Sequence, residues 1–150
     1  MTYDSRIDTY EHIAVVRMYL MDVVEQLIHR SLVHDNSKLV EPELSVFNEY
    51  SPKLRNTVYG SDEYKTYLKE MGVALEHHYA HNSHHPEFHE SGMEGMTLID
   101  LVELFCDWVA ATKRHADGDI YRSIEQNQER FRYPRMVKRI LLNTAKAMKL

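Results

Sequence analysis

Apolar residues along the chain recur at three- and four-residue steps, the spacing that places them on one face of an α-helix. The first such stripe covers Thr9 to His29, and a strongly apolar one runs from Leu98 to about His115. No segment shows a sustained alternation of apolar and polar residues, which is the pattern of a half-buried strand. The sequence therefore predicts an all-α protein: a compact bundle of about six to seven helices, in a single domain spanning residues 1–150.

Residues that favour helix ends indicate several boundaries. Ser61 is an expected N-cap, and Thr97 is another, with Asp100 at the position that completes a capping box. Gly118 is expected to stop the helix that Thr97 begins. Two further helices are predicted at Asp119–Phe131 and about Arg135–Met148.

Prolines indicate further helix boundaries in the middle of the chain. Pro42 suits the first turn of a helix, which Ser51-Pro52 is expected to end. A helix that starts at Asp62 runs towards the histidines, and Pro86 ends any helix near His84 or His85. The remaining predicted segments are a short helical piece at Ser31–Lys38 and a loop at His85–Met96.

Composition narrows the classes of function. A formal net charge of −5 argues against generic nucleic-acid binding, which needs a basic face. No apolar run approaches the roughly 20 residues that cross a bilayer, and the polar segment Met1–Asp8 is unlike a signal peptide. The one cysteine, Cys106, excludes a disulfide framework and is expected to be a small buried hydrophobe. We therefore expect a cytoplasmic protein without membrane contact, and the sequence leaves open whether it is a homo-oligomer.

Histidine is the outlier in the composition. Imidazoles crowded near carboxylates most often bind a divalent metal ion. On a helix, His77, His81 and His84 would share one face, and His78, His81 and His85 another, so the choice among His77, His78 and His81 stays open. Of the ten histidines, six fall within thirteen residues: His77, His78, His81, His84, His85 and His89.

Two earlier histidines and an aspartate are further candidate ligands. His34 and Asp35 are adjacent, and a helix end would let both side chains converge on one ion. His12 lies near the start of the first helix, and on one straight helix it would be about 33 Å from His34. A metal site that includes both therefore requires the chain to reverse between about Gln26 and Leu32.

Three carboxylates lie on the otherwise apolar helix that follows Thr97. Asp100, Glu103 and Asp107 have the i, i+3, i+7 spacing of one helix face. Carboxylates are almost never fully buried unless they are paired, and a metal ion would compensate their charge. Asp100 has the alternative role of capping its helix, and Glu103 that of an acid behind a ligand or at the edge of the core.

These motifs resemble those of the HD-domain metal-dependent phosphohydrolases, which carry a helical His, a His-Asp pair and a distal Asp on a late helix. The string His34-Asp35-Asn36-Ser37-Lys38 resembles the His-Asp-x-Gly-Lys motif of the subgroup that acts on cyclic dinucleotides, with Ser37 where Gly is usual. His84-His85-Pro86-Glu87 and the run that starts at Asp107 resemble two further motifs. The chain is also similar, along nearly its whole length, to a small phage and bacterial family that has the same HDxSK and HHPE motifs.

The resemblance implies an HD-like fold with two divalent ions, which would be Mn²⁺, Fe²⁺, Ni²⁺, Co²⁺ or Zn²⁺. It implies that Asp35 bridges the ions, that Lys38 contacts a substrate phosphate, and that a metal-activated water attacks a nucleotide or another small phosphate ester. Two alternatives stay open: a di-iron oxygenase with the same ligands, or a non-catalytic phage factor that sequesters a nucleotide. The implied ligands are His12, His34, Asp35 and Asp107 for one ion, and Asp35, one of His77 and His78, His84 and His85 for the other.

Overall fold

The computed structural model of the chain describes residues 3–58, 60–114 and 118–150. Those residues form seven α-helices and three short 3-10 helices, and no strand occurs among them. This confirms the predicted all-α class with six to seven helices. The chain divides into two units, Met1–His34 and Asp35–Leu150. In the part of the chain that the structure describes, no helix has both the length and the apolar character needed to cross a membrane.

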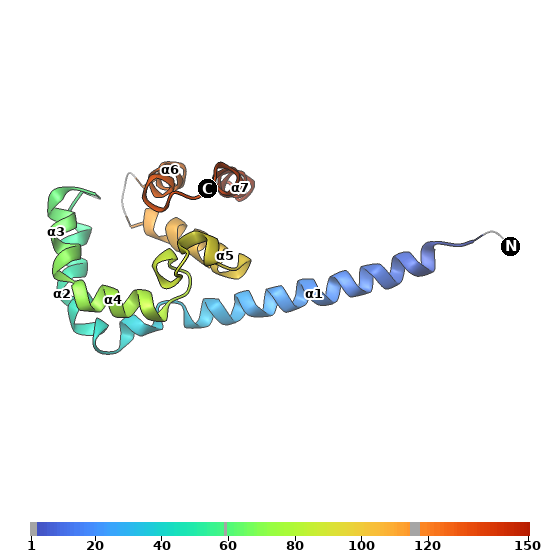
Figure 1. Cartoon of the computed structure of the whole chain (residues 1–150), viewed down its shortest axis with the longest axis horizontal. Helices are drawn as coiled ribbons and strands as arrows, with labels where there is room; N and C mark the ends of the chain where they lie inside the picture. Colours follow the sequence, from blue (N-terminus) through green and yellow to red (C-terminus); the bar gives the residue numbers. More distant parts are fainter. Residues whose placement is uncertain (1–2, 59, 115–117) are drawn as a thin grey trace. The chain divides into compact units, whose positions relative to one another are not determined.

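The first unit is one long helix, α1 (Arg6–Val33), which is drawn as a single uninterrupted coil in Figure 1. The reversal that we predicted between Gln26 and Leu32 does not occur. No glycine or proline interrupts these 28 residues, and the weak helix former Ser31 donates its hydroxyl to the Ile28 carbonyl within the helix, at 2.7 Å. Residues 31–33 therefore belong to α1, and only η1 (Asn36–Leu39) remains of the predicted piece at Ser31–Lys38.

The second unit begins with helices α2 (Glu43–Arg55), α3 (Asp62–Glu70) and α4 (Gly72–His81), which pack against one another. Ser61 caps α3 as predicted, because its hydroxyl accepts the Tyr64 N–H at 3.1 Å. The predicted end of α2 at Ser51-Pro52 is wrong, since the helix continues to Arg55 with Pro52 inside it. A proline removes one backbone hydrogen bond, and here that loss falls close to the end of the helix.

Helices α5 (Leu98–Thr112), α6 (Ile120–Phe131) and α7 (Arg135–Ala147) complete the unit and match the predicted helices closely. The predicted capping box of Thr97 and Asp100 is confirmed, whereas the expected helix end near His115 lies outside the described residues. The predicted loop at residues 85–96 contains two short 3-10 helices, η2 (Pro86–Phe88) and η3 (Gly92–Gly95). The main hydrophobic core lies between α5, α6 and α7 and contains Leu104, Phe105, Trp108, Ile120, Ile124, Tyr133, Leu141 and Ala145.

Helix α5 buries apolar residues on one side and acidic residues on another, and the acidic side belongs to the candidate site. Leu104, Phe105 and Trp108 face the core, while the acids Asp100 and Glu103 are buried on another side of the same helix. Cys106 lies on neither buried side and is exposed, so the expectation of a buried cysteine was wrong. The apolar neighbours of Cys106 in the sequence do not imply that it is buried, because consecutive residues of a helix point about 100° apart.

Candidate metal centre

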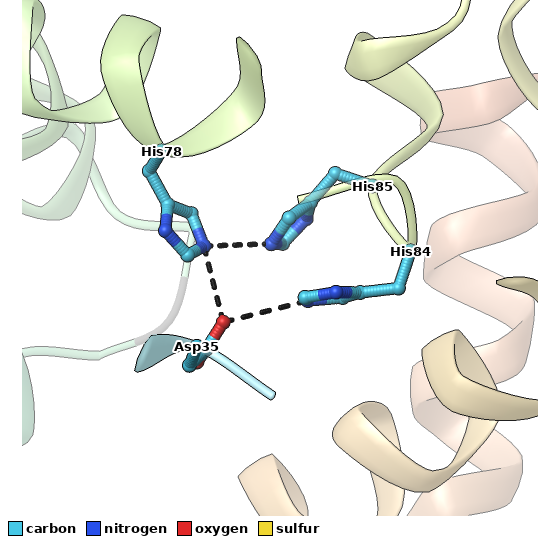
Figure 2. A group of neighbouring side chains, drawn as sticks. All are labelled: Asp35, His78, His84 and His85. Carbon is cyan, nitrogen blue, oxygen red and sulfur yellow. Dashed lines mark hydrogen bonds and ion pairs between the residues drawn. The ribbon is translucent and has the colours of Figure 1, made fainter. Parts of the chain in front are cut away.

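Four side chains of the second unit point towards one another: Asp35, His78, His84 and His85 (Figure 2). Each offers a ligand atom, and these four atoms lie within 4.8 Å of one another. Asp35 Oδ1 is 3.4 Å from His78 Nε2 and 3.5 Å from His84 Nε2, and the Nε2 atoms of His78 and His85 are 2.8 Å apart. We call these four residues the metal cluster.

The histidines reach the metal cluster from α4 and from the segment after it. His78 shares the buried face of α4 with Ala74, four residues earlier. The helix ends at His81, and the chain that follows is tied down at Ser83, whose hydroxyl donates to Asp100 Oδ1 at 2.7 Å. The carbonyl of Ser83 also accepts the ring N–H of His89 at 2.8 Å, so the side chain of His89 is bonded to this segment. These contacts fix the backbone that presents His84 and His85.

Asp35 contributes through an unusual backbone conformation. Its φ of 57° is left-handed, which an aspartate tolerates better than most residues other than glycine. Its two oxygens have separate roles: Oδ1 faces the rings of His78 and His84, and Oδ2 accepts a hydrogen bond from Lys38 Nζ at 2.6 Å. Lys38 Nζ also lies 4.9 Å from the centre of the Phe47 ring. The ammonium predicted to contact phosphate is therefore held beside the metal cluster.

Buried carboxylates behind two of the rings determine where their protons lie. His78 Nδ1 is 2.9 Å from Oε2 of Glu43, and His84 Nδ1 is 3.2 Å from Oε1 of Glu103. An ionised carboxylate only accepts hydrogen bonds, so in a neutral ring beside it the proton lies on Nδ1 and Nε2 offers its lone pair to the cluster. This arrangement, a carboxylate behind a histidine, is the usual orienting partner of metal-binding imidazoles. The hydrogen bond between His78 and His85 then takes its proton from Nε2 of His85, so His85 would bind an ion through Nε2 only in its other tautomer, with the proton on Nδ1.

The lowered pKa values of His78 and His85 favour the neutral form of these two rings. Burial lowers the pKa of His85 to about 3, and the neighbouring His84 and His78 rings add to this effect. Burial also lowers the pKa of His78, with a further contribution from the charge of Lys38. Neutral imidazoles together with one carboxylate form a donor set that suits Mn²⁺, Fe²⁺, Co²⁺, Ni²⁺ or Zn²⁺.

The lowered pKa values predict how the stability of the chelator-treated protein depends on pH. Because the folded pKa of His85 lies below the unfolded value near 6.5, the unfolded chain binds the extra proton, and the free energy of unfolding should fall as the pH drops from 7 to 5. The slope of the unfolding free energy against pH is proportional to the number of protons taken up on unfolding, and in His85→Gln this number should be smaller by about one. Urea unfolding at several pH values measures this slope for the wild type and for His85→Gln. Equal slopes would contradict the lowered pKa of His85.

Helix α5 contributes three acids to the candidate site: Asp100, Glu103 and Asp107. Glu103 partners His84, and Asp100 caps α5 while it also holds Ser83, so neither is itself a member of the cluster. A carboxylate oxygen of Asp107 lies within 4.8 Å of one of Asp35. These two carboxylates are therefore close enough to offer oxygens to one cation.

Two of the other predicted ligands, His77 and His81, have hydrogen-bond partners outside the metal cluster. His77 Nδ1 bonds to Glu43 Oε1 at 2.7 Å, and the exposed His81 donates its Nδ1–H to the His77 carbonyl. Neither residue belongs to the group of ligand atoms that lie within 4.8 Å of one another. His12 and His34 belong to the first unit, where α1 runs unbroken between them, about 33 Å along the helix axis at 1.5 Å per residue. An ion shared by His12 and His34 within that unit is therefore excluded, which corrects the ligand set that we predicted for the first ion.

Sequence reasoning missed Glu43, Ser37 and Asn82 as site residues. Glu43 is fully buried, and Asn82 is nearly so. A signal for Glu43 was present, because it stands four and seven residues before Phe47 and Tyr50 and so interrupts an apolar helix face with an acid. The same reasoning had singled out Glu103 on α5.

The family to which the sequence belongs is shown by one comparison. A family described as "Family of unknown function (DUF5662)" matches residues 1–150. Comparisons with curated proteins and with solved structures found no match. The chain, with its cluster of Asp35, His78, His84 and His85, is therefore a member of the DUF5662 family.

Proposed function

We propose that this protein is a metal-dependent phosphohydrolase that acts on a nucleotide or another small phosphate ester. One observation carries the proposal: the Nε2 lone pairs of His78 and His84 face Asp35 Oδ1 at 3.4 and 3.5 Å, and a buried carboxylate stands behind each ring. Asp35, His78, His84 and His85 would hold one divalent ion, and Asp35 with Asp107 would supply oxygens for a second. The order of these residues in the sequence and its resemblance to HD-domain phosphohydrolases support the same proposal.

Hydrolysis needs an activated water and a way to offset phosphoryl charge. A bound divalent ion lowers the pKa of its water towards neutrality. Lys38 offers three ammonium donors beside Asp35 and is only partly exposed, so it would draw the phosphate oxygens to the cluster. The protein's net charge of −5 disfavours a polymeric nucleic acid as substrate and supports a small one.

The test is a metal analysis combined with a panel of phosphate esters. The protein would be stripped with a chelator and reloaded separately with Mn²⁺, Fe²⁺, Co²⁺, Ni²⁺ and Zn²⁺. We expect at least one bound ion per chain and metal-dependent release of phosphate or of a nucleotide from mononucleotides, cyclic nucleotides or p-nitrophenyl phosphate. Lys38→Met should retain the ion but lose activity, because it removes the ammonium while keeping a flexible apolar side chain of similar length. His29→Ala, which removes an exposed histidine of α1, is the control.

Two results would contradict the proposal. Iron-dependent consumption of O₂ without phosphate release would indicate the oxygenase chemistry that some HD-like proteins perform. Tight nucleotide binding that is independent of metal and without turnover would indicate a sequestering protein. Each outcome appears in the same panel if oxygen consumption and nucleotide binding are recorded with phosphate release.

A further inference from the structure

Behind His78 lies a polar network of which the proposed function uses only the Glu43 carboxylate. Its centre is Glu43, at the start of α2, whose side chain is fully buried. Oε1 of Glu43 is 2.7 Å from His77 Nδ1, and Oε2 is 2.9 Å from His78 Nδ1. The carboxylate therefore holds two adjacent histidines, of which only His78 belongs to the cluster.

Two further side chains complete this network around Oε2. The Ser37 hydroxyl donates to Glu43 Oε2 at 3.1 Å and accepts from Asn82 Nδ2 at 2.8 Å. Asn82 donates its other amide hydrogen to the His78 carbonyl at 2.7 Å, so both of its hydrogens are used. Ser37 comes from η1, Glu43 from α2, and Asn82 from the end of α4, so three segments meet behind one ring.

Glu43 is held in its charged form by these partners. Burial on its own would raise the pKa of this carboxyl, but the hydrogen bonds from His77 and Ser37 and the charge of His78 outweigh burial and lower it. An ionised Glu43 accepts the Nδ1–H of His78 and leaves its Nε2 as a lone pair directed at Asp35. A charged partner also raises the basicity of the ring as a ligand.

We propose that Glu43, supported by Ser37 and Asn82, is a positioning residue that sets the tautomer of His78 and with it the metal affinity of the cluster. This inference rests on the proposed metal centre and goes beyond it by assigning the residue that fixes which nitrogen of His78 carries the proton and which faces Asp35. Ser37 acquires a role here as well, because its hydroxyl enters the network at the position where the similar His-Asp-x-Gly-Lys motif has glycine.

The decisive variant is Glu43→Gln, which keeps the shape but has one acceptor oxygen where glutamate has two. Only one of His77 and His78 can then keep its acceptor. We expect metal affinity, measured by competition with a chromophoric chelator, to fall by about 10- to 100-fold, the range for lost partners of metal ligands. Long-range ¹H–¹⁵N NMR of the chelator-treated protein should show His78 as the Nδ1–H tautomer in the wild type and as a mixture in the variant.

The matched control is Glu49→Gln, which removes an exposed acid from the same helix and should leave both readouts unchanged. If Glu43→Gln does not fold, Ser37→Ala decides the question, with an expected loss of affinity of about three- to tenfold, the range for the loss of one ordinary hydrogen bond. Wild-type affinity and an unchanged His78 tautomer in the folded variant, with a lower melting temperature as the only change, would overturn the inference. If the wild type binds metal and the variant does so more weakly, but neither releases phosphate, the proposed function fails and the positioning role stands.

Discussion

Replacing Asp35 with alanine is expected to abolish metal binding and, with it, any phosphate release. Asp35 is the one carboxylate in the four-residue metal cluster, and Oδ1 faces two of the three rings. Without it, nothing in the cluster offsets the ion's charge, so the loss should exceed the roughly 10- to 100-fold cost of losing a partner of a ligand. Equilibrium dialysis followed by elemental analysis measures the bound metal directly.

The control for Asp35→Ala is Asp35→Asn. Asparagine shares with aspartate a tolerance of the left-handed conformation seen at this position, whereas alanine in that conformation costs roughly 1–2 kcal/mol. Asp35→Asn should therefore melt near the wild-type temperature in the presence of chelator and still bind metal far more weakly. If either variant keeps a full complement of metal and full activity, Asp35 is not a ligand and the proposed function fails.

The second large effect is a contrast between two neighbouring residues, His77 and His78. Both donate to the same buried carboxylate, Glu43, but only His78 directs its second nitrogen at Asp35. We expect His78→Ala to lose the ion, whereas His77→Ala should change metal affinity by less than about threefold, because His77 is partly exposed and water can replace its hydrogen bond.

This pair of variants tests the geometry closely because the two residues have the same side chain, the same helix and the same hydrogen-bond partner. Isothermal titration with the preferred ion gives both affinities, and circular dichroism confirms the helical content of each variant. Equal losses in the two variants would show that the ring orientation described for His78 is not what selects the ligand.

Much of the fold could be predicted because its signals are local. Thr97 and Asp100 form the expected capping box, Ser61 caps α3, and the apolar stripe of α5 marks a buried helix. A local signal gave a wrong prediction at the end of α2, where a single proline did not end the helix. Pro52 was expected to end α2, but it costs one hydrogen bond near the end of a helix whose other residues support it.

The site was only partly predictable because its details depend on contacts between distant segments. The sequence indicates that Asp35, His84 and His85 are candidates, but on a bare helical pattern His77 and His78 are equivalent. The choice between them depends on which ring faces Asp35, a residue of a distant segment, because Glu43 bonds to both rings. The hypothesis that included His12 needed a chain reversal, and α1 contains no residue that would enforce one.

The most direct test of the metal centre is anomalous diffraction from crystals grown with Mn²⁺ or Zn²⁺, recorded on both sides of the absorption edge of the metal. We predict a peak between Asp35 Oδ1 and the Nε2 atoms of His78, His84 and His85, at about 2.0–2.2 Å from its ligands once the side chains close on the ion. A fully loaded protein with its anomalous peak elsewhere, and none among these four side chains, would contradict the assignment.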